Sequence, residues 1–269
     1  MKRFLFLLLT FLFTAPSAFC KPEDAEPYEV SFPCDAVVLG TLAAYDAAEH
    51  FLLDKPADAW DGNFLNKGDI NAFDSVLAQP YNKTYDKITN VFMAADLLLP
   101  GLFIAADIKN PDRWTTVCVM YSESLLLTYA ILNTLKDNIA RTRPYMYFEE
   151  SALTDDLIDD RWNSFPSGHT SAAFCGIAFF STLLLDGYVE CQGWGVYAMA
   201  AGIACAAGTG ACRLYAGKHF LSDVLTGAAI GTFSGMIVPW PHKKTSDSKD
   251  PLISKLQFTG TGLNVHIEL

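Results

Sequence analysis

The sequence predicts an all-α protein: a bundle of about five to six core helices, inserted in a membrane and followed by a short C-terminal β-hairpin. Five apolar segments follow one another from about residue 90 onward. The chain as a whole is 51% hydrophobic. Its last residues alternate between apolar and polar side chains, as strands do. Apolar runs of this length are typical of helices that are buried in lipid or in protein.

The first 20 residues have the pattern of an export signal. Lys2 and Arg3 precede the apolar run 4–14, and small residues follow it. A basic start, a short apolar core and a small-residue cleavage region are typical of secretory signals. We therefore expect residues 1–20 to be a signal peptide or an N-terminal anchor, with a lipid anchor at Cys20 as an alternative.

Residues 21–89 are more polar, and we expect an exposed N-terminal segment with amphipathic helices. Within it, residues 34–53 are apolar but are interrupted by Asp35, Asp46 and Glu49. An apolar stretch interrupted in this way favours an amphipathic helix over a membrane span.

Residues 90–241 are predicted to form the helical bundle. The apolar segments are 91–108, 114–135, 170–185, 191–212 and 224–241, and the last three contain no Asp, Glu, Lys or Arg. Several are long enough to cross a bilayer, and Pro100-Gly101 is expected to kink the first. A soluble helical protein stays an alternative, because Asp96 and Glu123 are costly in lipid.

Loop charges predict the orientation of these helices. Crossing five times from an external N-terminus places residues 136–169 and 213–223 outside, and Lys109, Arg113 and Lys243-Lys244 inside. Basic residues favour the inner side of a membrane. The expected location is a bacterial-type cytoplasmic membrane with the loops 136–169 and 213–223 on the outer, periplasmic side.

The tail, residues 242–269, is predicted to contain the β-hairpin. Leu263, Val265 and Ile267 alternate with polar residues, and Gly260 and Gly262 can make the turn.

Charge and cysteine content exclude some functions. The formal net charge is −11, which argues against nucleic acid as a partner, because such proteins present a basic face. A phosphate site would therefore need a local concentration of Lys and Arg. The seven cysteines have no zinc-binding spacing.

One candidate anion site is the helix start Pro166-Ser167-Gly168-His169. Proline suits the first turn of a helix, where unpaired N–H groups and the helix dipole attract anions. Gly168 lets an anion approach the backbone, and His169 can transfer a proton near neutral pH. Taken alone, an ordinary helix start with a chance histidine explains the pattern equally well.

A second cluster lies at the end of the segment 114–135. Lys136 and Arg143 are seven residues apart, so on a helix they would share a face and bind one anion together. Pro144 is expected to end that helix. Basic residues at a helix C-terminus also simply complement its dipole, so this cluster alone proves little.

The third cluster holds Arg213, His219 and Asp223. His219 and Asp223 are four apart at the start of the last apolar segment. Asp223 is expected to accept a hydrogen bond from one imidazole nitrogen, which leaves the other as a nucleophile or base. Arg213 offers a forked cation suited to phosphate oxygens.

Together the three clusters resemble the signature of the type 2 phosphatidic acid phosphatase superfamily, which includes class A bacterial acid phosphatases and vanadium haloperoxidases. The pattern is Lys-x6-Arg-Pro, then Pro-Ser-Gly-His, then Ser-Arg-x5-His-x3-Asp. The motifs cover residues 136–223, and the helical pattern extends the resemblance to about 90–241. Cys212 stands where the family usually has serine. Cysteine is nearly the same size but a weaker hydrogen-bond donor, so this departure puts the fine tuning of the activity in doubt more than the reaction itself.

The resemblance implies a role for each motif residue. The residues implied to bind the phosphoryl oxygens are Lys136, Arg143, Ser167, Gly168 and Arg213. His219 would attack phosphorus to form a phosphohistidine, oriented by Asp223, and His169 would protonate the leaving oxygen and then activate water. No metal and no cofactor is expected. The acidic run between residues 149 and 160 is interpreted as a solvated loop.

The implied function is a metal-independent phosphoric ester hydrolase that acts on phosphate monoesters or pyrophosphates, of lipids in the first place. Phosphatidic acid, phosphatidylglycerol phosphate, polyprenyl pyrophosphate and lipid A phosphate are the candidate substrates, with the membrane as a partner. A soluble periplasmic non-specific acid phosphatase is the alternative, and a vanadium-dependent haloperoxidase comes after it.

Overall fold

The computed structural model describes residues 27–52, 60–107, 109–188, 193–244, 256–259 and 262–265. The expected signal or anchor at residues 1–20 lies outside them. The helices are α2 (Phe32–Leu52), α3 (Ala72–Ser75), α4 (Lys83–Leu98), α5 (Gly101–Ala106), α6 (Pro111–Asn138), α7 (Asp155–Asp159), α8 (Gly168–Leu185), α9 (Trp194–Tyr215) and α10 (Leu221–Ile237), with short 3₁₀ turns at η1 (Lys67–Asp69) and η2 (Pro144–Tyr147). The strands are β1 (Leu256–Thr259) and β2 (Gly262–Val265).

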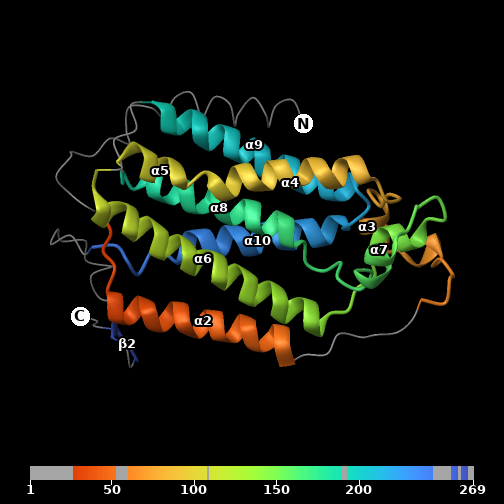
Figure 1. Ribbon diagram of the computed structural model, residues 1–269, viewed down its shortest axis with the longest axis horizontal. Coiled ribbons are helices and arrows are strands. Elements are labelled where there is room, and N and C mark those ends of the chain that lie inside the picture. Colours follow the sequence, from red (N-terminus) through yellow and green to blue (C-terminus); the bar gives the residue numbers. More distant parts are fainter. Residues whose placement is uncertain are drawn as a thin grey trace.

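Helix α8 lies at the centre of the bundle and contacts α4, α6, α9 and α10. Figure 1 shows these helices running along the long axis of the molecule, with α2 against the outer side of α6 and with α3 and α7 at one end. Most of α8 is buried and apolar, as the absence of charges in 170–185 predicts. The all-α bundle is confirmed.

Helices α8 and α10 approach each other closely because α10 carries glycine at every fourth position. A Cβ at Gly227, Gly231 or Gly235 would lie only 2.0–2.6 Å from backbone oxygens of α8 or of its N-cap residue. Small residues at this spacing let two helix backbones touch, as in membrane helix pairs. The contact aligns the N-terminus of α10 with that of α8, and the Ser167 amide donates to the Asp223 carbonyl at 3.1 Å.

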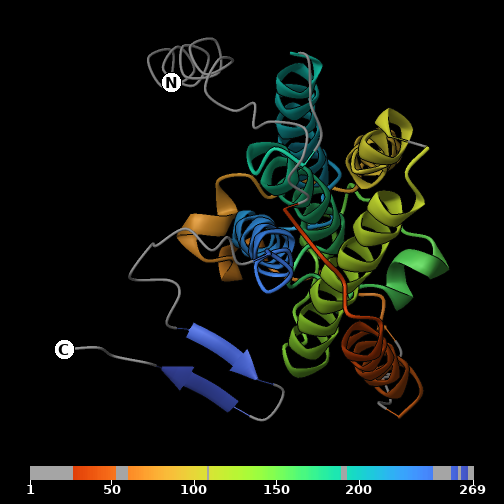
Figure 2. The same ribbon diagram turned by 90° about the vertical axis from the view of Figure 1, so that its left-hand side faces the viewer.

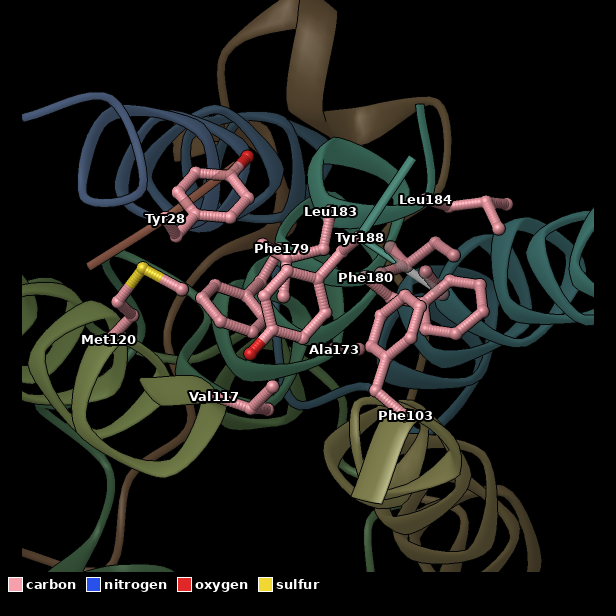
Figure 3. Close-up of a cluster of buried hydrophobic side chains, with 12 residues drawn as sticks. Tyr28, Phe103, Val117, Met120, Ala173, Phe179, Phe180, Leu183, Leu184 and Tyr188 are labelled. Carbon is pink, nitrogen blue, oxygen red and sulfur yellow. The ribbon is translucent and has the colours of Figure 1, made fainter. Parts of the chain in front are cut away.

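The largest apolar cluster surrounds the C-terminal half of α8 (Figure 3). Phe103 of α5 stacks on Phe180 with ring centroids 4.8 Å apart, and Tyr188 packs edge-on against Phe103. This cluster fixes α8 at one end. Its N-terminal turn, about 20 Å away along the helix, is left to form a polar site.

The first predicted apolar segment differs from expectation at both ends. Its helix, α4, begins at Lys83 rather than near residue 90, because the Asn82 side chain caps the amides of Thr84 and Tyr85. The expected kink at Pro100-Gly101 is a break that separates α4 from α5.

The N-terminal segment is less exposed than its polarity predicts. Helix α2 packs along α6. Just before it, Tyr28 forms a β-bridge with Lys243, beyond the end of α10, and the Glu29 amide donates to the His242 carbonyl at 2.9 Å. Asp74 of α3 is almost fully buried. Residues of the segment 21–89 thus belong to the packed molecule.

Among the described helices, α6, α8 and α9 are long and apolar enough to cross a membrane, and α10 is a shorter apolar helix. The outer surface carries many large apolar side chains. Leu98 is 74% exposed, Tyr197 is 73% exposed and Met236 is 56% exposed. Apolar surfaces of this extent are costly in water and suit lipid.

The predicted hairpin is present. Strands β1 and β2 pair antiparallel, with Leu256 opposite Val265 and Thr259 opposite Gly262 (Figure 2). Gly262 therefore belongs to the second strand, and the other predicted turn glycine, Gly260, lies outside the described residues.

Candidate active site

A cavity of about 370 Å³ opens where α8 begins and α9 ends. Its lining comes from α4, α6, α8, α9 and the loops around residues 143, 160 and 218: Asp86, Asn90, Lys136, Arg143, Asp160, Gly168, His169, Arg213, Lys218 and His219. The structure thus brings six of the eight predicted site residues to one cavity. The other two, Ser167 and Asp223, lie behind its wall.

His219 is held with one ring nitrogen toward the cavity. Its Nδ1 lies 2.6 Å from the Ser164 carbonyl oxygen, which can only accept, so Nδ1 carries the proton. Nε2 then presents a lone pair and lies 3.2 Å from Nη1 of Arg143. Burial lowers the pKa of His219 well below its ordinary value, and the charges of Arg143 and Arg213 lower it further. The ring is therefore a neutral nucleophile or base.

Arg143 is fixed by three groups besides His219. It donates to the Asp160 carbonyl at 2.9 Å, to the Lys218 carbonyl at 2.9 Å and to the Asp160 carboxylate at 3.0 Å. A guanidinium that is held on several sides keeps its orientation when a ligand binds. A fixed donor of this kind can stabilise negative charge that develops on the ligand.

Two residues of α4 that no sequence motif indicated complete the opposite wall. Arg213 at the end of α9 pairs with Asp86 at 2.6 Å. The His169 Nε2 lies 2.9 Å from the Asn90 side-chain oxygen. Asp86 and Asn90 are four residues apart on one face of α4. Nothing in the sequence relates that face of α4 to His169 and Arg213, which lie about 80 and 125 positions later.

Lys136 and Arg143 reach the cavity by a different route from the one predicted. They do not share a helix face, because α6 ends at Asn138. The chain then runs extended, and Arg141 forms a parallel bridge with Asn163. Arg143 precedes the short turn at Pro144 and enters the cavity from a loop.

The N-terminus of α8 faces the cavity with Gly168, as predicted. A Cβ at Gly168 would meet nothing within 4 Å, so a ligand can approach the backbone. The Ser167 side chain is turned away and shares a hydrogen bond with Thr170 at 2.8 Å. Cys212, the departure from the family pattern, is buried on α9 and does not line the cavity.

Asp223 does not accept the expected hydrogen bond from His219, since its Oδ2 lies 3.9 Å from Nδ1. It accepts instead from the Ser164 hydroxyl at 2.6 Å and from the Phe220 amide at 2.8 Å. Ser164 in turn holds His219 through its carbonyl. The carboxylate therefore acts on the imidazole through Ser164.

Arg141 connects Asp223 to the N-terminal segment. It donates to Asp223 and, at 2.6 Å, to Asp74 of α3. Asp74 also accepts from the Ser222 amide and hydroxyl, both at 2.9 Å. Burial would raise the pKa of Asp74, but the hydrogen bonds from Ser222, Asn71 and Arg141 outweigh it and lower that pKa.

The acidic run is not simply a solvated loop. Its last member, Asp160, bridges Arg143 at 2.8 Å and Lys218 at 3.3 Å. Burial alone would raise the pKa of Asp160, and these two cations lower it. Lys218 is a further cation of the cavity, and the motif pattern assigns it no role. Burial and the charge of Arg143 lower its pKa.

The described lining is suited to a dianion. It contains four Lys or Arg side chains and two carboxylates, each carboxylate paired with arginine. The formal charges of these six side chains sum to +2, and they lie beside two imidazoles. A phosphoryl group matches this set in charge and in hydrogen-bond geometry.

A second hollow of about 260 Å³ adjoins the first. It shares Lys136, Asp160 and Gly168 with the cavity and continues along α6 past Asn133, Leu132 and Tyr129. A phosphate ester bound in the cavity therefore has a neighbouring space for its alcohol part.

Comparisons with known proteins agree with this arrangement. The family model described as the PAP2 superfamily matches residues 118–246. A lipid A 1-phosphatase from Porphyromonas gingivalis is 36% identical over 157 residues, which are 58% of this chain and 31% of the relative. The chain thus spans about a third of the length of this curated relative.

A solved structure, that of Aquifex aeolicus LpxE, overlaps 65% of this chain and 98% of its own, at 25% identity and a TM-score of 0.44. The matched family region, residues 118–246, contains every predicted site residue from Lys136 to Asp223. The family match, the curated relative and the convergence of the three motifs agree: over residues 118–246, a little under half of the chain, this protein is similar to the PAP2 superfamily, the type 2 phosphatidic acid phosphatases.

Proposed function

We propose that this protein is a metal-independent phosphatase of membrane lipids that works through a phosphohistidine. One observation carries the proposal: the His219 Nε2 lone pair and His169 line one cavity together with Lys136, Arg143 and Arg213. Such a set can attack phosphorus, stabilise the charge on its oxygens and supply a proton to the leaving group.

The proposed reaction has two steps. His219 Nε2 attacks phosphorus and the bond to the ester oxygen breaks, while His169 gives its proton to that oxygen. Water then attacks the phosphohistidine, and His169, now neutral, takes the proton from that water. Inorganic phosphate leaves and His219 is regenerated. Asn90, which holds the His169 Nε2, positions this ring for both transfers.

Lipid phosphates are the favoured substrates for two reasons. The cavity lies at the ends of α6, α8 and α9, the helices long enough to span a bilayer, so it would lie at headgroup depth. The matched relative is a lipid A 1-phosphatase. We therefore rank lipid A 1-phosphate first, before phosphatidic acid, phosphatidylglycerol phosphate and polyprenyl pyrophosphate. The active site is proposed to face the periplasm.

The test measures phosphate release by the full chain in detergent, with chelator present, over this lipid panel and a soluble ester. Lipids should be hydrolysed best, and His219→Ala should lower the rate by at least about 10³-fold. His266→Ala, outside the three motifs, is the matched control. Rates on the soluble ester equal to those on lipids would favour a non-specific phosphatase.

A trapping experiment tests the mechanism separately. With substrate labelled in its phosphoryl group, His169→Ala should accumulate acid-labile label on the protein, because release of the phosphohistidine is slowed. His219→Ala should take up none. Equal labelling of the two variants would show that His219 is not the nucleophile.

A further inference from the structure

A second cluster of ionisable side chains lies outside the catalytic cavity. Asp35 in the first turn of α2, Glu123 on α6 and His242 after α10 each place one ligand atom within 4.8 Å of the others. Glu123 is thirteen residues before Lys136 on the same helix, so the cluster lies about 20 Å from the cavity. The proposed reaction uses none of these residues.

The geometry is that of ligands around one small ion. His242 Nε2 lies 3.3 Å from Asp35 Oδ1 and 3.4 Å from Glu123 Oε2. Two ligands on a tetrahedral zinc ion, each bonded at 2.0–2.1 Å, are about 3.4 Å apart. The two observed separations match that value.

The histidine is oriented as a ligand. Its Nδ1 lies 2.9 Å from the Val238 carbonyl oxygen, so Nδ1 carries the proton and Nε2 turns its lone pair to the carboxylates. A lone pair beside two carboxylates is repelled unless a cation lies between them. A proton on Nε2 is one such cation, and a metal ion is the other.

Unpaired carboxylate oxygens favour the metal. Within the described part of the chain, Asp35 Oδ2 and Glu123 Oε1 are buried and have no hydrogen-bond partner. The Glu123 residue is only 2% exposed, and a protonated His242 would leave both oxygens unsatisfied. A divalent ion would neutralise two carboxylates and could use these oxygens as further ligands.

We propose that Asp35, Glu123 and His242 bind one divalent transition-metal ion, with zinc the best fit. An imidazole ligand argues against Mg²⁺ and Ca²⁺, which take oxygen ligands. The ion would join α2 and the start of the segment after α10 to α6. Glu123 and His242 lie inside the family region 118–246 and Asp35 lies outside it, so this site would fasten the N-terminal helix to the family bundle.

The test uses the full chain in detergent, stripped with chelator, reloaded with zinc and freed of excess ion. We expect about one zinc per chain by elemental analysis, and a melting temperature about 5 °C above that of the stripped protein. Glu123→Gln keeps the shape of the side chain and should lose both the zinc and the stabilisation. His242→Ala should also lose the zinc.

Asp96→Asn is the matched control, because Asp96 is a buried acid on α4 whose carboxylate oxygens have no partner among the described residues. It should bind zinc like the unaltered chain. Full zinc binding by Glu123→Gln would overturn the proposal. So would an unaltered chain that retains no zinc, which would indicate a protonated His242. Neither readout depends on phosphate release, so this inference and the proposed phosphatase can fail separately.

Discussion

In the described part of the chain, buried His219 and half-buried His242 are anchored alike and surrounded oppositely. Both His219 and His242 have Nδ1 on a backbone carbonyl oxygen, at 2.6 and 2.9 Å. His219 Nε2 faces the guanidinium of Arg143, whereas His242 Nε2 faces Asp35 and Glu123. The carbonyl contact fixes the tautomer of each ring. The residues around Nε2 then decide whether its lone pair lies in a site for an anion or in a site for a cation. Changing one set of neighbours at a time separates the two roles.

The largest expected effect is the loss of the guanidinium beside His219. Arg143→Ala should reduce kcat/KM on the preferred lipid by about 10²–10³-fold, the usual cost of removing one group that stabilises transition-state charge. Arg143→Lys should recover only part of this, since lysine cannot bridge Asp160, the Lys218 carbonyl and the ligand together. Steady-state kinetics measure both, and equal rates for Ala and the original arginine would remove Arg143 from the site.

The next effect comes from the support behind the imidazole. Asp223→Asn should lower kcat about 10- to 100-fold with little change in KM, because it disturbs Ser164 and hence the direction of His219. Ser164→Ala keeps the carbonyl that holds Nδ1 but removes the hydroxyl that links it to Asp223, so it should lower kcat to a similar extent. An unchanged kcat in Ser164→Ala would contradict the indirect route.

The pH dependence should follow the lowered pKa of His219. The ring is an effective nucleophile only when neutral, so the acid limb of kcat/KM due to it should lie below about pH 6.5. Arg143→Gln removes a positive neighbour, so it should move that limb upward. Stability should also fall at low pH. The His219 ring binds a proton more readily in the unfolded chain, so the free energy of unfolding decreases as the pH drops below about 6.5.

The smallest effect should be that of metal removal on catalysis. The cluster of Asp35, Glu123 and His242 lies about 20 Å from the cavity, and groups so far apart act nearly independently. Stripping zinc should therefore change kcat less than about twofold at a temperature well below melting. If stripping lowers the rate of Glu123→Gln as much as that of the unaltered chain, a metal lies in the catalytic cavity.

Local patterns in the sequence predicted the helices well. Runs without charge predicted α8, α9 and α10, and the Pro-Ser-Gly-His start placed Gly168 and His169 at the N-terminus of α8. Helix formation and capping depend on neighbours within a few residues, so they can be read from the chain. Even so, Pro144 did not end a helix that carried Arg143, since α6 ends at Asn138.

The partners of each charge were decided by the tertiary structure alone. Asp86, Asn90 and Asp160 reach the cavity because α4 packs on α8 and α9 and because the acidic loop folds over Arg143. Motif spacing by itself predicted six residues that the structure brings to one cavity, because each motif is set by its own short stretch of chain. It could not determine which carboxylate meets which cation, because those contacts form only when helices far apart in sequence bury their faces together.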